Sequence, residues 1–120
     1  MKDITTNFKY KGKNYPAIFN LNVMEKIQGE YDNLDAWSEL IGGSKNAEPD
    51  LKALKFGITE AINEAIDIQN EEKGEKEPFV TTKFVGRMLT EIGIEKASGL
   101  FFETVQKSTE DESEDQSKNE

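Results

Sequence analysis

The chain has 120 residues, a length that supports one small domain with a modest core. It contains no Cys and no His, which excludes disulfides, thiolate zinc sites, and the commonest general base and metal ligand. The formal net charge is −9, so the chain as a whole should repel nucleic acid and anionic membrane surfaces. We therefore expect neither nucleic acid nor a membrane as a partner.

Residues 4–19 predict a β-hairpin, because apolar and polar side chains alternate on both sides of a polar turn. Gly12 in that turn tolerates the positive φ that tight hairpin turns need. Pro16 has no N–H to donate to a ladder, so the second strand should lie at a sheet edge. Since two strands alone are marginally stable in water, the hairpin must pack against helices.

Two short helices should follow the hairpin. Asn22, with Glu25 three residues later, is an N-cap signature for the first helix. Asp35 should cap the second helix, and Gly42-Gly43 should stop it. The two apolar stripes consist of Val23, Met24, Ile27 and Tyr31, and then of Trp37, Leu40 and Ile41.

The strongest helical periodicity begins near Pro49, which suits the first position of a helix. The pattern predicts a helix of roughly 20 residues, about 30 Å long, that ends in the polar turn "NEEKGEKEP". Its apolar stripe consists of Leu51, Leu54, Ile58, Ala61, Ile62, Ala65 and Ile66.

Two further helices complete the predicted domain. Thr81 should cap the first of them, with Val80 and Val85 as a hydrophobic staple, and Gly93 suits a left-handed closing position. The last helix should run from about Glu95 to Lys107. The stripes consist of Val85, Met88, Leu89 and Ile92, and then of Ala97, Leu100, Phe101 and Val105.

Residues 108–120, "STEDESEDQSKNE", should form a disordered acidic tail. They hold six acids and one Lys, with too little apolar surface to offset the entropy of ordering. We therefore expect an α+β, mostly α fold, in which a single domain of residues 1–107 packs an N-terminal β-hairpin on a bundle of four to five helices. No apolar run is long enough for a signal peptide or a membrane span, so we expect a cytoplasmic protein.

The acidic residues do not predict a metal or catalytic site. Residues 67–76 lack the spacing of an EF-hand calcium loop. Glu60 and Glu64 lie one helical turn apart, as glycosidase or di-metal carboxylates can, but such acids usually mark the solvent-facing side of a helix. The lysines of "KYKGK" favour protection of a sheet edge over nucleic-acid binding. We predict no catalytic residue, no metal and no cofactor, and hence no enzyme.

The candidate protein-interaction residues are aromatic: Trp37, Phe101 and Phe102. A single Trp on a short helix most often fills a core. Phe101 and Phe102 point about 100° apart on a helix, so one of them should be exposed, or covered by a partner or a second copy. Burial of both under the hairpin is the alternative. The residues thus predict a helical interaction module and leave its partner open.

Four stretches occur in a familiar order: "YPAIFNLNVMEKIQGEY", "LDAWSELIGG", "EPDLKALKFGITEAINEAIDIQNEE" and "TTKFVGRMLTEIGIEKA". Over residues 8 to about 106, the chain resembles the tail assembly chaperones of long-tailed bacteriophages, in particular those of phages and prophages of Gram-positive bacteria. The likeness rests on the number and order of these stretches, since none is a catalytic signature. The resemblance implies a protein that binds the phage tape-measure protein and keeps it soluble and extended. Tail-tube subunits would then polymerise around the tape measure and displace the chaperone, which is absent from the finished virion.

The resemblance also implies self-association, the host cytoplasm as location, and the tail-tube protein as a possible second contact. The family commonly makes a longer product by ribosomal frameshifting, and "SKNE" is compatible with it because Lys118 and Asn119 codons can supply a run of adenines. The alternative function is an acidic inhibitor that mimics DNA or blocks a host protein, which would need its carboxylates on ordered elements. A carboxylate-only enzyme and a small adaptor protein stay open as further possibilities.

Overall fold

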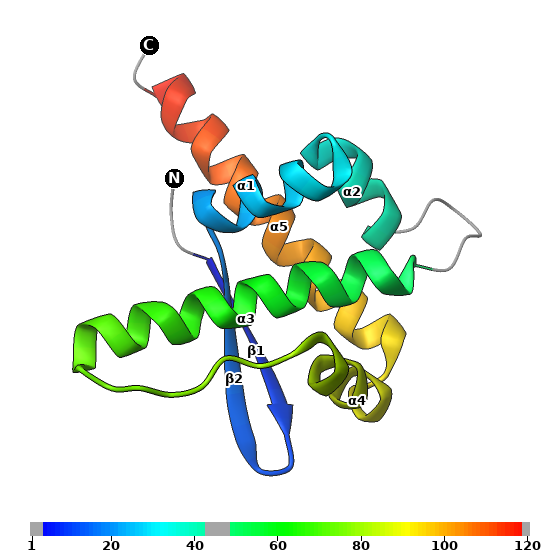
Figure 1. Ribbon diagram of the computed structural model, residues 1–120. Coiled ribbons are helices and arrows are strands. Elements are labelled where there is room, and N and C mark those ends of the chain that lie inside the picture. The colour runs from blue at the N-terminus through cyan, green and yellow to red at the C-terminus, as the bar shows by residue number, and fades with distance from the viewer. Residues whose placement is uncertain (1–3, 43–48, 119–120) are drawn as a thin grey trace.

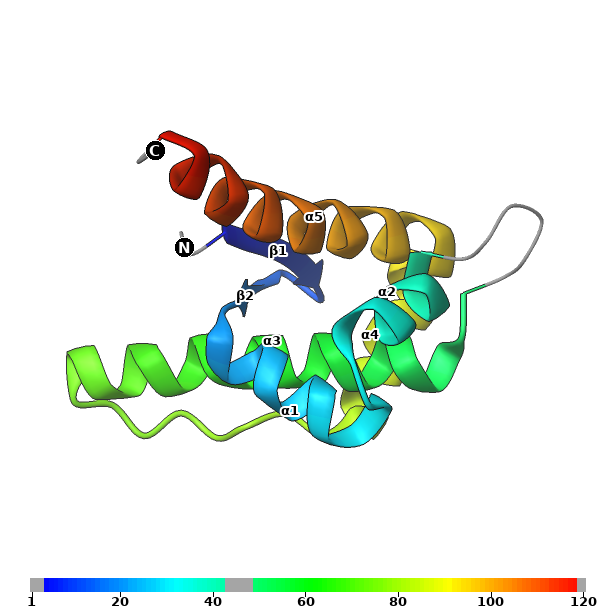
Figure 2. The same cartoon turned by 90° about the horizontal axis from the view of Figure 1, so that it is seen from above.

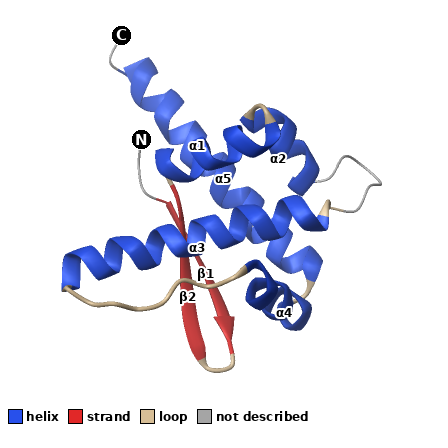
Figure 3. Cartoon of the chain, in the orientation of Figure 1, coloured by secondary structure: helices blue, strands red, loops and turns tan. Residues whose placement is uncertain are grey.

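The chain folds into an N-terminal β-hairpin followed by five helices, counted within the residues that the structure describes (Figure 1). The computed structural model describes the backbone of residues 4–42 and 49–118. The elements are β1 (Ile4–Tyr10), β2 (Lys13–Phe19), α1 (Leu21–Tyr31), α2 (Leu34–Gly42), α3 (Leu51–Lys73), α4 (Thr82–Ile92) and α5 (Ile94–Lys118). The predicted architecture, a hairpin packed on four to five helices, is confirmed, and helix dominates the chain (Figure 3).

The hairpin closes as the sequence predicts. β1 and β2 pair antiparallel, with Tyr10 opposite Lys13. The turn residues Lys11 and Gly12 both have positive φ, at 52° and 78°, as a two-residue turn that matches the strand twist requires. Pro16 lies in an edge strand, because the described sheet has two strands only.

The hairpin lies between the two long helices, α3 and α5 (Figure 2). Helix α3 packs against β2, and α5 packs against β1. Helices α1 and α2 pack against α3, while α4 contacts α3, α5 and β1. Two strands that would be marginally stable by themselves are thus supported on both sides.

Trp37 of α2 is at the centre of the core and is fully buried. The Phe19 ring stacks on it with 5.8 Å between centroids, and the Phe101 ring meets it edge-on at 6.0 Å. The indole Nε1 donates a 3.0 Å hydrogen bond to the Ala53 carbonyl of α3. A Cβ on Gly57 would lie 2.4 Å from Trp37 Cζ2, so the missing side chain lets the indole lie directly against the α3 backbone.

Helix α4 begins and ends at the predicted residues. The Thr81 hydroxyl caps it by accepting a 3.1 Å hydrogen bond from the Phe84 N–H. Gly93 ends it with a positive φ of 105°, although its ψ of 130° lies outside the left-handed helical region. The Gly93 N–H donates to the Leu89 carbonyl, and the Gly93 carbonyl accepts from the Ala97 N–H. One residue therefore terminates α4 and starts α5.

The first three helices begin at caps other than the predicted ones, because neighbouring polar residues compete for the role. The side chains that accept a backbone N–H three residues later are those of Asn20, Asn33 and Asp50. Asn22 and Asp35 are therefore not caps, and Pro49 precedes its helix instead of starting it. Gly42 is the last residue of α2, and Gly43 lies outside the described residues.

Helix α5 continues to Lys118, beyond its predicted end at Lys107. Ser108 is fully buried, and its hydroxyl donates a 3.4 Å hydrogen bond to the Phe19 carbonyl. Contact between α5 and the hairpin therefore includes Ser108, the residue after the predicted boundary. The described backbone is helical as far as residue 118, because a helix already nucleated by packing is extended at little cost. Residues 119–120 lie outside the described part.

Candidate functional site

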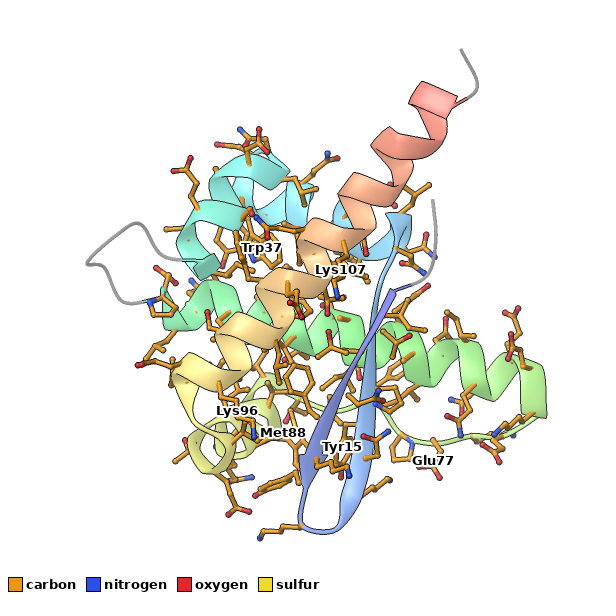
Figure 4. The ribbon with its side chains drawn as sticks, turned by 180° about the vertical axis from the view of Figure 1, so that it is seen from behind. Tyr15, Trp37, Glu77, Met88, Lys96 and Lys107 are labelled. Atoms are coloured by element: carbon orange, nitrogen blue, oxygen red, sulfur yellow. The ribbon has the colours of Figure 1, made fainter. Side chains whose placement is uncertain are left out.

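An apolar groove lies beside the C-terminal half of α3. Its walls are β2, the C-terminal half of α3, residues 77–81 and the start of α4, and its volume is about 560 Å³. The apolar side chains that line it include Tyr15, Pro16, Ile62, Ile66, Phe79 and Phe84. We call it the Phe79 groove. Figure 4 labels two residues of its lining, Tyr15 on β2 and Glu77 on the segment after α3.

Two asparagines of α3 hold one wall of the Phe79 groove in place. The Asn63 amide donates to the Val80 carbonyl at 3.0 Å and accepts from the Val80 N–H at 2.8 Å. The Asn70 amide forms the same pair of bonds with Glu77, at 3.1 and 3.0 Å. Asn63 and Asn70 are two helical turns apart and therefore share one face of α3. Each asparagine side chain bonds to a backbone N–H and carbonyl, as a neighbouring β-strand would. The segment after α3 runs extended alongside that helix (Figure 3).

The floor of the Phe79 groove is aromatic, and its mouth carries one ion pair. The Phe84 and Tyr15 rings contact each other, with 5.5 Å between centroids. Lys13 Nζ lies 3.8 Å from Glu77 Oε2, but both side chains are more than half exposed, so the pair contributes only about 0–1 kcal/mol. The Phe79 side chain is 58% exposed. A large exposed aromatic side chain beside an apolar groove is typical of a surface that binds another protein.

The three predicted interaction residues lie elsewhere. Trp37 and Phe101 are fully buried, so in this fold they form core and offer no exposed surface. Phe102 is half-buried and covers Gly42, where a Cβ would lie 2.6 Å from the Phe102 ring. None of the three is among the described residues that line the Phe79 groove.

Sequence reasoning missed Phe79. The available signal was the short apolar run Pro78–Phe79–Val80, which interrupts an otherwise polar stretch between two predicted helices. Such a run has no period, so it predicts neither a helix nor a strand. Whether Phe79 is exposed depends on which elements pack over it. A local sequence pattern does not contain that information.

The acid pair predicted on α3 has a structural contact. Glu64 Oε2 accepts hydrogen bonds from the side-chain amides of Asn20, at 2.8 Å, and Asn22, at 3.0 Å. These bonds tie the start of α1 to the middle of α3.

Among the described residues, no cluster of three or more acidic side chains could hold a metal ion. The charged residues that line the Phe79 groove are Lys13 and Glu77, so the groove offers mainly apolar contact area.

Comparisons of the chain with protein-family models, curated proteins and solved structures found no match. In the described residues, no helix combines the length and the apolar character needed to cross a membrane.

Proposed function

We propose that this protein is a tail assembly chaperone of a long-tailed bacteriophage or prophage. It binds the tape-measure protein in the host cytoplasm and keeps it soluble and extended while tail-tube subunits polymerise around it. The observation that supports this proposal is the Phe79 groove, a sizeable apolar surface with an aromatic side chain at its edge. The order of the four sequence stretches described above supports it independently.

The physical task matches the groove and the charge. A long chain with apolar helical stripes aggregates when those stripes meet one another. An apolar groove covers such a stripe in the helix-in-groove manner, with anchors at spacings of three and four residues. The net charge of −9 keeps the complexes apart through mutual repulsion.

The direct test is co-expression with the candidate tape-measure protein, with its soluble fraction as the readout. Phe79→Ser should lower that fraction at least by half. Leu21→Ser is the matched control, because Leu21 is similarly exposed, at 64%, but lies outside the groove lining. An equally insoluble client with and without this protein would refute the chaperone function. Equal activity of Phe79→Ser and wild type would refute only the assignment of the groove.

Three subsidiary parts of the proposal have their own tests. Self-association and contact with the tail-tube protein are checked by light scattering and by co-purification. The longer frameshifted product requires a slippery heptamer and an overlapping downstream frame in the genomic DNA, and their absence would exclude it.

The second candidate, an acidic inhibitor that mimics DNA or blocks a host protein, is favoured by one observation. The helical backbone of α5 continues through Lys118 and provides the acidic segment with an ordered frame. If this function is correct, removal of residues 110–120 should abolish inhibition of the target. Under the chaperone proposal, the same truncation should leave the client soluble.

A further inference from the structure

A second groove lies between the N-terminal part of α3, helix α4 and the start of α5, with a volume of about 370 Å³. We call it the basic groove, because its charged lining residues are Lys55, Lys83 and Arg87. Its apolar lining comes from Leu51, Leu54, Leu89 and Ile94. The described linings of the basic groove and the Phe79 groove have no residue in common.

None of the three cations of the basic groove forms an ion pair with another described residue. In a chain of net charge −9, no acidic residue is found in the described lining of this groove. The ion pairs formed between described residues, Lys13–Glu77 and Lys107–Glu103, involve none of the three. Lys83 and Arg87 are one turn apart on α4, and like charges at this spacing destabilise a helix. A bound anionic group would offset that repulsion.

Gly86 of α4 lines the basic groove beside Lys55 of α3. A Cβ at this position would lie 3.4 Å from Lys55 Cδ and 3.7 Å from Lys55 Nζ. These distances are ordinary van der Waals contacts, so the Lys55 stem lies against α4 at Gly86. Its ammonium group is thereby brought to the helix that carries the other two cations, although it comes from α3.

The apolar part of the basic groove limits what can fill it. The Leu51 side chain is 55% exposed, whereas Leu54 and Leu89 form the buried floor. The acidic segment of this chain, residues 108–120, contains no apolar residue. It could therefore pair with the cations of the groove but could not cover its leucines. A nucleic-acid backbone has the same deficiency and is also repelled by the net charge.

We propose that the basic groove binds an amphipathic helix of a partner protein. The apolar side chains of that helix lie over Leu51, and its flanking Asp or Glu side chains face Lys55, Lys83 and Arg87. This mode combines apolar anchoring with charge complementarity, which determines partner choice. The surface is separate from the Phe79 groove, so one molecule can hold two helical segments at once. The inference does not depend on the proposed chaperone function.

A pair of synthetic helices tests the inference with the full chain. The first peptide, of about 18 residues or five turns, carries Leu on one face flanked by Glu, and the second has Lys in place of each Glu. Fluorescence anisotropy should show that the Glu peptide binds about tenfold more tightly, with a difference that shrinks at high salt. The Lys55→Gln, Lys83→Gln, Arg87→Gln triple variant should lose this preference.

The control variant replaces three exposed lysines outside both groove linings, Lys9, Lys11 and Lys26, by Gln. It should bind like wild type, and circular dichroism melts should show that both triple variants are folded. Equal affinity for the two peptides, or an unchanged preference in the basic-groove variant, would overturn the proposal. A Glu peptide that binds only after removal of residues 110–120 would identify this chain's own acidic segment as the occupant and would also overturn it.

Discussion

Two aromatic regions of this protein differ in how completely they are covered. Around Trp37, rings from β2, α2 and α5 meet and are sealed from solvent. In the Phe79 groove, rings from β2, α4 and the segment between α3 and α4 line one surface, but Phe79 is more than half exposed. The same residue types therefore hold the fold together in one region and form an accessible surface in the other. The difference between the two regions is whether other elements cover the aromatic rings.

The largest expected change in the free energy of unfolding comes from removing one aromatic ring of the core, compared with one ring of the Phe79 groove. Phe101→Ala should lower the free energy of unfolding by about 3–5 kcal/mol, because it leaves a cavity beside Trp37. Phe79→Ala should change it by no more than about 0.5 kcal/mol, as is usual for surface substitutions. Urea denaturation measures both values. A similar loss for the two variants would show that Phe79 is part of the core.

Two glycines test the tight packing of the core against a helix backbone. Gly57→Ala should cost about 1–2 kcal/mol, since the new Cβ would lie 2.4 Å from Trp37 Cζ2 and 3.2 Å from Phe101 Cε2. Gly29→Ala in α1 meets no described atom within 4 Å and should stabilise by up to about 1 kcal/mol through helix propensity. Thermal melts monitored by circular dichroism show whether each substitution raises or lowers the melting temperature. Stabilisation by Gly57→Ala would mean that the indole can move away from α3.

Thr59 tests a polar group inside the core. Its side chain is buried, and its hydroxyl has no hydrogen-bond partner among the described residues. Thr59→Val should therefore stabilise the protein by about 1 kcal/mol, because a desolvated hydroxyl is removed and the shape is kept. Thr59→Ser, which keeps the hydroxyl and loses the methyl group, should destabilise it. If the valine variant melts at a lower temperature than wild type, the hydroxyl is satisfied after all.

Two truncations locate the end of the folded domain. Removal of residues 110–120 should leave the melting temperature within about 2 °C of wild type. Removal of residues 108–120 also deletes the hydrogen bond from Ser108 to the Phe19 carbonyl and should cost about 0.5–1.5 kcal/mol, or several degrees. Calorimetry compares the two. An equal loss from both truncations would show that the acidic end of α5 itself stabilises the domain.

The smallest effect concerns Tyr31, whose ring contacts Phe56 at the edge of the core. Burial, followed by the negative charges of Asp50 and Glu30, raises the pKa of the Tyr31 phenol above its usual value near 10. The folded state therefore favours the neutral phenol of Tyr31. The stability that the phenol contributes is complete below pH 10 and is lost as the pH rises through the folded-state pKa. Spectrophotometric titration should show a tyrosine ionisation step above the usual pH that Tyr31→Phe removes. A titration curve without such a step in wild type would contradict the assignment.

The sequence predicted those parts of the fold that depend on a local period. The alternation in the hairpin and the stripes of the helices gave the elements, because burial of one face imposes these spacings. Cap positions were less predictable, since Asn20 and Asn22 are equally suitable and the end of β2 decides between them. The Phe79 groove and the core position of Gly57 were missed, because both depend on contacts between segments that are distant in sequence.

The two asparagine bridges along α3 have a consequence for how the groove can change. The Asn63 and Asn70 side chains bond to main-chain N–H and carbonyl groups of Val80 and Glu77, so these four hydrogen bonds do not depend on which side chains the wall displays. Substitutions at Phe79 or its neighbours can therefore alter which ligand is preferred without redesign of the backbone. A variant library restricted to these positions would search new specificities on a constant frame.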